Sequence, residues 1–304
     1  MVESGGLENR CSGNPATVGS NPTPSALLSV HLTTVALPRQ PPGAVQLRLV
    51  RPRLSTSQIE RLGVRLVEST EPAAADLELL HQVLGTYSEV LAGAVDRVRE
   101  GLGVSPTSRI KNTGTILEKL HRYGGSWLKS IQDLAGMRIV ARVDRRGQNA
   151  IVQQLIDVFG EDPRSPKVID RRLAPVHGYR AVHVVVFPEG VPVEIQVRTL
   201  WQHEWAELFE KLADLVGRGI RYGEPPARWW SPDQFEEMDA AARALVLGTH
   251  AVRTTTVELA LAVAGMIDAV EDGESTAPED PELDAYRRRV DEALVELRKH
   301  LEHV

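Results

Sequence analysis

One short run of the chain places polar side chains at every second residue. In Val193 to Thr199 (VEIQVRT), an acid, an amide and a base alternate with apolar residues. Because alternate residues of a β-strand share a face, Glu194, Gln196 and Arg198 would line one face while the apolar residues line a buried one. This row is a candidate site, although any half-exposed antiparallel strand also shows a single polar face.

The run before it, residues 179–187, alternates in the same way. Tyr179 and His183 would share one face and valines the other, and residues 188–190 (PEG) are typical of a hairpin turn. Two neighbouring strands would then carry polar side chains in register. This makes the alternative, an ordinary half-exposed antiparallel strand, less favoured. Tyr179 could stack on a base. A lone histidine such as His183 is more often a structural hydrogen-bonding residue.

A basic string, RIKNTGTILEKL, begins at Arg109. Lys111, Thr115 and Lys119 are spaced i, i+4, i+8, so the sequence predicts that they share one face of a helix. Two ammonium groups and a hydroxyl in a row suit a polyphosphate. The alternative is a solvated basic face, which this string alone favours.

A third string, DLAGMR, precedes a short β-branched run. An acid at the entry to a strand could place the Asp133 carboxylate for Mg²⁺, next to the Arg138 guanidinium, which can stack on a base. Asp133 as a turn residue and Arg138 in a surface ion pair are an equally good interpretation of this string.

Together, the three strings contain what transfer of a pyrophosphate group needs. They supply cations for a polyphosphate, two carboxylates for Mg²⁺, and planar groups for two nucleosides. Residues 109–142 carry seven Lys or Arg and only two acids, although the whole chain has a formal net charge of −6. The sequence therefore predicts a basic pocket in an acidic protein.

The elements that must position these residues follow from the hydrophobic periodicity. Helices are predicted over residues 57–67, 76–100, 114–123 and 148–159, and strands over 137–143, 167–170, 179–187 and 192–198. This order predicts an α+β fold, a mixed β-sheet flanked by helices, with additional N- and C-terminal helices. The C-terminal helices are predicted over 233–272 and 281–300, separated by an acidic loop.

Composition divides the chain into four parts. Residues 1–55 are rich in Gly, Ser, Thr, Asn and Pro, and we expect disorder there. Residues 56–105 form the N-terminal helices, 106–224 the core that contains the three strings, and 225–304 a C-terminal helical region.

Several classes of protein are disfavoured. Cys11 is the only cysteine, so a disulfide within the chain is impossible and a reducing cytoplasm is the expected location. No run reaches the roughly 18 apolar residues of a membrane span, and the N-terminus lacks the pattern of a secretion signal. We expect no membrane association.

The strings resemble the synthetase domain of the RelA/SpoT family, especially its short single-domain alarmone synthetases. The resemblance covers Arg109 to about Trp205 and rests on four motifs in the family's order, RxKxxx(S/T)IxxK, DxAGxR, GYRxxH and VEIQxRT. It implies that the protein transfers pyrophosphate from ATP to a ribose 3′-hydroxyl and that it requires Mg²⁺.

The resemblance also implies a role for each matching residue. The adenine of ATP would lie between Arg109 and Arg138, and its phosphates would bind to Lys111, Thr115 and Lys119. Asp133 and Glu194 would hold Mg²⁺, with Glu194 activating the acceptor hydroxyl. The acceptor would contact Tyr179, His183 and Arg198 of the last two motifs and Arg172 of the stretch before them. Gln196 would support the catalytic acids.

The chain departs from the family before Gly178, where a basic stretch that holds acceptor phosphates is shortened to residues 170–177 (DRRLAPVH). The acceptor therefore remains open between a guanosine nucleotide, GTP or GDP, and the 3′ end of tRNA, which toxic relatives modify. A degenerate binding or regulatory module is a third alternative. An antitoxin or a second copy of the chain is a candidate partner. The HD dipeptide of the family's hydrolase domain is absent.

Overall fold

The computed structural model describes residues 54–68, 71–302 and 304. Residues 1–53 lie outside it. They include Cys11 and nearly all of the segment, residues 1–55, for which disorder was predicted. The helices within these ranges are α1 (Thr56–Glu68), α2 (Ala74–Leu102), α3 (Thr113–Tyr123), α4 (Arg145–Phe159), α5 (Leu200–Val216), α6 (Pro232–Glu237), α7 (Ala240–Thr276) and α8 (Leu283–Leu301). The strands are β1 (Thr107–Ile110), β2 (Ala135–Ala141), β3 (Lys167–Asp170), β4 (Val182–Val186) and β5 (Val193–Thr199).

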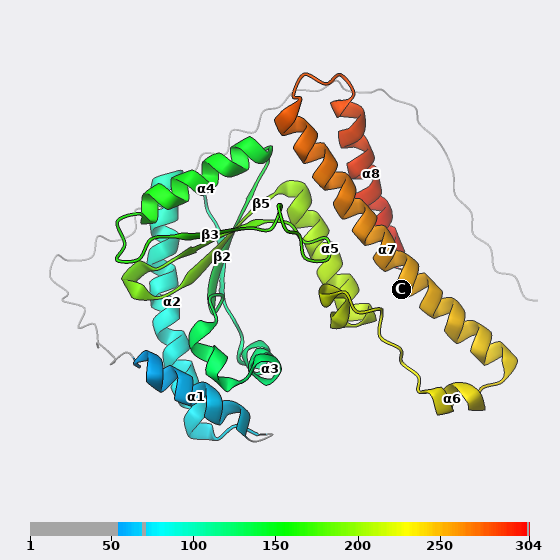
Figure 1. Cartoon of the computed structure of the whole chain (residues 1–304), viewed down its shortest axis with the longest axis horizontal. Coiled ribbons are helices and arrows are strands. Elements are labelled where there is room, and N and C mark those ends of the chain that lie inside the picture. Colours follow the sequence, from blue (N-terminus) through cyan, green and yellow to red (C-terminus); the bar gives the residue numbers. More distant parts are fainter. Residues whose placement is uncertain (1–53, 69–70, 303) are drawn as a thin grey trace, which may run out of the picture. The chain divides into compact units, whose positions relative to one another are not determined.

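The strands form one five-stranded sheet in the order β1-β2-β5-β4-β3. The central pair, β2 and β5, is parallel, and the other neighbours are antiparallel. The sheet is therefore mixed, and helices flank it (Figure 1). This confirms the predicted α+β class.

Alternation in β4 and β5 decides which face of the sheet is buried. Val193, Ile195 and Val197 are fully buried, and with Val184 they pack into a core that includes the apolar stripe of α2 and residues of α4. The opposite face is left to the polar residues of β2 and β5. Gly103, in the left-handed conformation at φ 67°, ends α2 and turns the chain toward β1.

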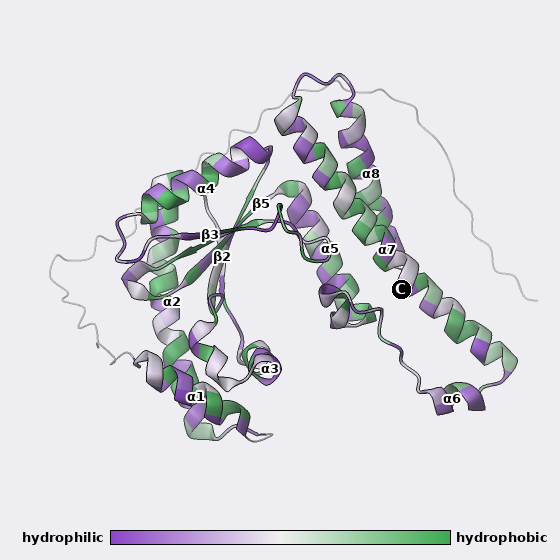
Figure 2. Cartoon of the chain, viewed as in Figure 1, coloured by the Kyte–Doolittle hydropathy of each residue, from purple (hydrophilic) through white to green (hydrophobic). Residues whose placement is uncertain are grey.

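A second hydrophobic cluster joins α5, α7 and α8. Trp205 of α5 is at its centre, stacked on Phe209 with ring centroids 4.7 Å apart, and its indole N–H donates to the Ala260 carbonyl of α7 at 2.6 Å. Hydrophobic residues recur along α7 and α8 between hydrophilic ones (Figure 2). No helix within the described ranges is long and apolar enough to cross a membrane.

The structure differs from the sequence prediction at the start of the core. Residues 107–110 form a strand that was not predicted, because TSRI is short and does not alternate in polarity. Lys111 precedes α3 and does not lie on the predicted helical face. Its backbone N–H donates to the Leu134 carbonyl at 2.8 Å, which continues the pairing of β1, and Asn112 caps the helix through the Thr115 N–H.

Other boundaries moved by a few residues. The predicted strand 137–143 begins at Ala135, and β4 begins only at Val182, so Tyr179 lies in the turn before it. In the C-terminal region a break at residues 238–239 separates α6 from α7. The helix α7 continues to Thr276, so the first half of the predicted acidic loop, residues 273–276, is helical.

Candidate functional site

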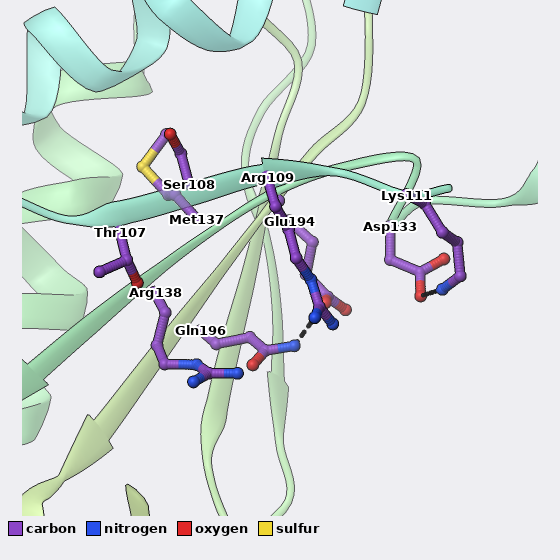
Figure 3. Close-up of a pocket in the computed structure, with 10 residues that line it drawn as sticks. Thr107, Ser108, Arg109, Lys111, Asp133, Met137, Arg138, Glu194 and Gln196 are labelled. Carbon is purple, nitrogen blue, oxygen red and sulfur yellow. Dashed lines mark hydrogen bonds and ion pairs between the residues drawn. The ribbon is translucent and has the colours of Figure 1, made fainter. Parts of the chain in front are cut away.

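A pocket opens on the polar face of the sheet, where the three strings meet (Figure 3). It is lined by residues of β1, β2 and β5 and of the loops that follow β1 and precede β2: Thr107, Ser108, Arg109, Lys111, Asp133, Gly136, Met137, Arg138, Glu194 and Gln196. Six of these are predicted site residues. Strands far apart in sequence therefore bring them into one pocket.

Strand register places the pocket above Gly136. Gly136 pairs with Arg109 of β1 on one side and with Glu194 of β5 on the other. Since a glycine has no side chain, it leaves an open space between the guanidinium and the carboxylate. One step along, Arg138 pairs with Gln196, which extends the polar floor.

Asp133 lies between two ammonium groups. Its carboxylate oxygens are 2.5 Å from Lys111 Nζ and 3.1 Å from Lys119 Nζ. Burial alone would raise the pKa of this carboxyl group, but the charges and hydrogen bonds of Lys111 and Lys119 outweigh it and lower the pKa. Asp133 is therefore ionised at neutral pH.

Glu194 accepts hydrogen bonds on both oxygens. His183 Nδ1 is 2.9 Å from Oε1, and Gln196 Nε2 donates to Oε2 at 2.9 Å. Burial raises the pKa of the Glu194 carboxyl, but the contacts with His183 and Gln196 outweigh that effect and lower it. The nearby charge of Asp133 acts in the opposite direction and raises the pKa of Glu194.

The contacts of Glu194 belong to a closed ring of hydrogen bonds. Arg198 donates to the side-chain amide oxygen Oε1 of Gln196 at 2.8 Å and to the Tyr179 hydroxyl at 3.1 Å, and that hydroxyl is 2.8 Å from His183 Nε2. Because an ionised Glu194 can only accept, His183 carries its proton on Nδ1 and accepts from Tyr179 on Nε2. Each donor in the ring therefore has an acceptor, and the Glu194 carboxylate accepts a hydrogen bond from each of its two neighbours in the ring.

The hydrogen-bond ring also fixes the side chain of Tyr179, whose stacking on the acceptor base stays a prediction. Its hydroxyl is committed to His183, and its ring lies under the Arg198 guanidinium, 5.1 Å from the ring centroid. Burial raises the pKa of this phenol. The side chain is thus held in one orientation beside Glu194.

The contacts of the remaining donor-site candidates vary. Among the described residues Arg109 has no hydrogen bond or ion pair, so its guanidinium is available to a ligand. Thr115 is not a lining residue of the pocket, and its hydroxyl is hydrogen-bonded to the Asn112 carbonyl at 3.0 Å and side chain at 2.8 Å. Its predicted phosphate contact would require that arrangement to open.

Arg138 has a neighbour that the sequence did not indicate. Its guanidinium pairs with Glu207 of α5 at 2.8 Å, and His203, one turn earlier on α5, is close enough for its pKa to be affected. Burial, followed by the charge of Arg138, lowers the pKa of His203, so this imidazole is neutral. No motif marked these two residues, because only the packing of α5 beside β2 brings them to Arg138.

The structure does not bring Arg172 into the site. Its guanidinium pairs with Asp170 at 2.6 Å and donates to Gln148 and Asn149 of α4 at 2.9 and 2.7 Å. The Arg172 side chain is largely buried by these contacts, and α4 packs against the core face of the sheet, opposite the pocket. Arg172 does not line the pocket in this arrangement, and its contact with the acceptor stays a prediction.

The donor set of the pocket fits Mg²⁺, the ion that the resemblance implies. Mg²⁺ binds one or two carboxylates and completes its coordination with water and substrate phosphates. Asp133 and Glu194 line the same pocket, and both are ionised. Groups of three or more His, Cys, Asp or Glu that could hold a metal ion by themselves are absent from the part of the chain that the structure describes.

Comparison with known proteins agrees with this location. A family model described as "Region found in RelA / SpoT proteins" matches residues 108–213, which include β1 to α5. Uncharacterized proteins of Mycobacterium tuberculosis and Mycobacterium bovis are each 38% identical to the chain over 196 residues, covering 62% of this chain and 70% of theirs.

Similarity to solved structures is weaker. The small alarmone synthetase 1 from Bacillus subtilis matches with 19% identity and a TM-score of 0.42, over 63% of this chain and 99% of its own. A GTP pyrophosphokinase family protein from Streptococcus pneumoniae matches with 20% identity and a TM-score of 0.40, over 70% and 97%. At these scores the similarity supports no conclusion about substrates.

Proposed function

We propose, from the premise that this chain belongs to the family of RelA/SpoT proteins, that it is a pyrophosphokinase that uses ATP and Mg²⁺. The acceptor would be a ribose 3′-hydroxyl, with GTP or GDP as the first candidate. One observation carries the proposal. Two ionised carboxylates, Asp133 and Glu194, line a pocket that also contains the basic side chains Arg109, Lys111 and Arg138.

The contacts of Asp133 support a change of partners when ATP binds. Lys111 and Lys119 neutralise this carboxylate in the free protein. A polyphosphate would compete for the two ammonium groups, which bind phosphate oxygens as readily as carboxylate oxygens. Their movement would release Asp133 to bind Mg²⁺, which when present would offset the charge of the phosphate oxygens.

Glu194 is suited to take the acceptor proton. The 3′-oxygen would form a bond to the β-phosphorus of ATP, while the bond from that phosphorus to the oxygen bridging to the α-phosphate breaks and AMP leaves. The proton of the 3′-hydroxyl would pass to Glu194. His183 and Gln196 orient the carboxylate for this step through their hydrogen bonds to its two oxygens.

Arg172 gives a specific reason to keep a second acceptor. The stretch before Gly178 would have to bind the 5′-phosphates of a guanosine nucleotide, but the Arg172 guanidinium is occupied by Asp170, Gln148 and Asn149. The terminal adenosine of tRNA brings no 5′-polyphosphate to this position. The 3′ end of tRNA is therefore the alternative acceptor.

An acceptor assay tests the proposal. The purified chain is incubated with Mg²⁺ and ATP labelled on the γ-phosphate, and GDP, GTP, AMP and bulk tRNA are offered separately. Label in a guanosine nucleotide supports the first candidate, and label in tRNA supports the second. If none of these acceptors takes label, the enzymatic proposal is overturned in favour of a binding module.

Substitution of the carboxylates tests the assignment of the site. Asp133→Asn and Glu194→Gln keep the shape of each side chain but remove the charge that attracts Mg²⁺, so we expect folded proteins that transfer no label. Glu118→Gln is the matched control, because Glu118 lies on α3, does not line the pocket and forms an exposed ion pair with Arg218. Wild-type rates in both carboxylate variants would refute the assignment.

A further inference from the structure

A second cavity lies on the other side of the segment that leads into β2. Its volume is about 500 Å³, within the range of small-molecule sites. Its lining residues come from the start of α1, from α2, residues 129–132, the loop between α4 and β3, and the turn between β4 and β5. They include Ile59, Val83, Tyr87, Arg164, Phe187 and Val191. It shares no lining residue with the catalytic pocket.

Tyr87 places a polar group in this cavity. The residue is only 7% exposed, and its hydroxyl has no hydrogen-bond partner among the residues that the structure describes. Burial raises the pKa of this phenol, so the hydroxyl keeps its proton at neutral pH. Because Tyr87 lines the cavity, its hydroxyl can form a hydrogen bond with a bound ligand.

Arg164 supplies a positive charge at the same cavity. Its guanidinium lies over the Phe187 ring, 3.9 Å from the ring centroid, and has no carboxylate partner within the described ranges. Lys129, the other cation of the lining, is paired with Glu60 at 2.5 Å. The lining also contains one acid, Glu189, which has a contact of its own. The cavity therefore offers the Arg164 guanidinium to one anionic group, next to apolar walls formed by Ile59, Val83 and Val191.

We propose that this cavity is an effector site for a small organic anion with a flat apolar body. The anionic group pairs with Arg164, the body lies against the Phe187 ring and the apolar wall, and a polar edge hydrogen-bonds to the Tyr87 hydroxyl. The volume of the cavity, the Arg164 guanidinium over the Phe187 ring and the Tyr87 hydroxyl all point to this one class of ligand.

The position of the cavity connects it to catalysis. Gln132 lines it, and the next residue, Asp133, lines the catalytic pocket. Pro192 lines it two residues before Glu194. A ligand that orders these two segments therefore changes the placement of both carboxylates, so it alters ATP affinity by several-fold or more. This coupling rests on the proposed function, whereas binding to the cavity does not.

Binding is tested with anilinonaphthalene sulfonate, a planar aromatic compound with one sulfonate that fluoresces in apolar sites. We expect saturable binding to the full chain, weakened about tenfold or more by Arg164→Gln because a charge-assisted contact is lost. Thr86→Trp, which fills the cavity from α2, should abolish it, and Tyr87→Phe should weaken it. Arg99→Gln, an exposed arginine of α2 that pairs with Asp96, is the control.

Circular dichroism confirms that each variant is folded. Equal affinity of the wild type, Arg164→Gln and Thr86→Trp would overturn the proposed site. A calorimetric titration with ATP, with and without the probe, then tests the coupling. An ATP affinity that is measurable but unchanged by the probe would refute the effector role, whereas the absence of ATP binding would refute the proposed function and leave the cavity result standing.

Discussion

Glu194 is the acceptor at the end of the ring of hydrogen bonds formed with Tyr179, His183, Gln196 and Arg198. This arrangement keeps a buried carboxylate ionised without a direct ion pair to Lys or Arg. The hydrogen bond from His183 is the largest influence that lowers the pKa of Glu194 against the effect of burial. The proposed catalytic role of Glu194 would therefore depend on a residue that need not touch the substrate.

Replacement of His183 should move the pH dependence of activity. In the wild type the lowered pKa keeps Glu194 ionised, and activity is lost only as pH falls through that pKa. In His183→Ala burial is less opposed, so the pKa rises and the carboxylate becomes protonated at a higher pH. We expect the acidic limb of the kcat profile to shift to higher pH, and the exposed His81→Ala to leave it in place. An unshifted limb would show that His183 does not control Glu194.

Between β3 and β4, the turn that carries Tyr179 is held by the C-terminal helices. The Arg180 guanidinium contacts Asp268 of α7 at 2.9 Å and donates to the Gly178 carbonyl at 3.0 Å. Gly178 has φ +83°, and a Cβ there would be 2.8 Å from the Trp205 ring of α5 and 3.2 Å from Ala264 of α7. The packing of α5 and α7 thus leaves room only for glycine at this position.

A comparison of Gly178 with Gly190, which has a similar φ angle, distinguishes backbone strain from steric crowding of the side chain. Gly190 has φ +79° and nothing within 4 Å of an added Cβ, so Gly190→Ala should lose about 1 kcal/mol through backbone strain alone. Gly178→Ala should lose more, because the turn must also move away from Trp205 and Ala264. Urea unfolding measures both. In the acceptor assay only Gly178→Ala should raise the KM for the acceptor, and equal effects of the two changes would contradict this account.

The described part of the chain contains two hydrophobic clusters, and the chain passes directly from one into the other. Strand β5 belongs to the sheet core, and α5, which follows it without a gap, belongs to the helical cluster. Buried polar contacts connect the clusters as well. Gln202 donates to Glu271 of α7 at 2.7 Å, and Gln148 of α4 donates to Gln202 at 2.9 Å. We infer that the two clusters unfold together.

Leucine truncations in the two clusters test this cooperativity. Leu155 in the sheet core and Leu294 in the helical cluster are both essentially fully buried, so each change to alanine should lower the free energy of unfolding by about 2–5 kcal/mol. Because the two residues belong to different clusters, their effects should add within about 0.5 kcal/mol. Urea unfolding should show a single transition. Two separate transitions would show that the clusters are independent.

Several features of the protein could be predicted from local sequence alone. Alternation in VEIQVRT predicted the burial of Val193, Ile195 and Val197, because a strand has a period of two wherever it lies. It did not predict that Arg198, on the polar face, is buried as well. The periodicity of apolar residues located α2 and α4 and led to the α+β class. Six of the ten residues that line the pocket are among the site residues that the motifs indicated.

Contacts between distant segments could not be predicted in this way. The pairing of Lys111 with Asp133 depends on β1, an edge strand stabilised by its pairing with β2 rather than by its own residues. Arg172 was expected at the site, but Asp170 and α4 supply closer partners on the other face of the sheet. The second cavity, with Tyr87 and Arg164, arises only where α2 packs near the turn between β4 and β5. Periodicity and motifs describe neighbours along the chain, whereas charge pairing and cavities depend on which surfaces pack together, and only the tertiary structure decides that.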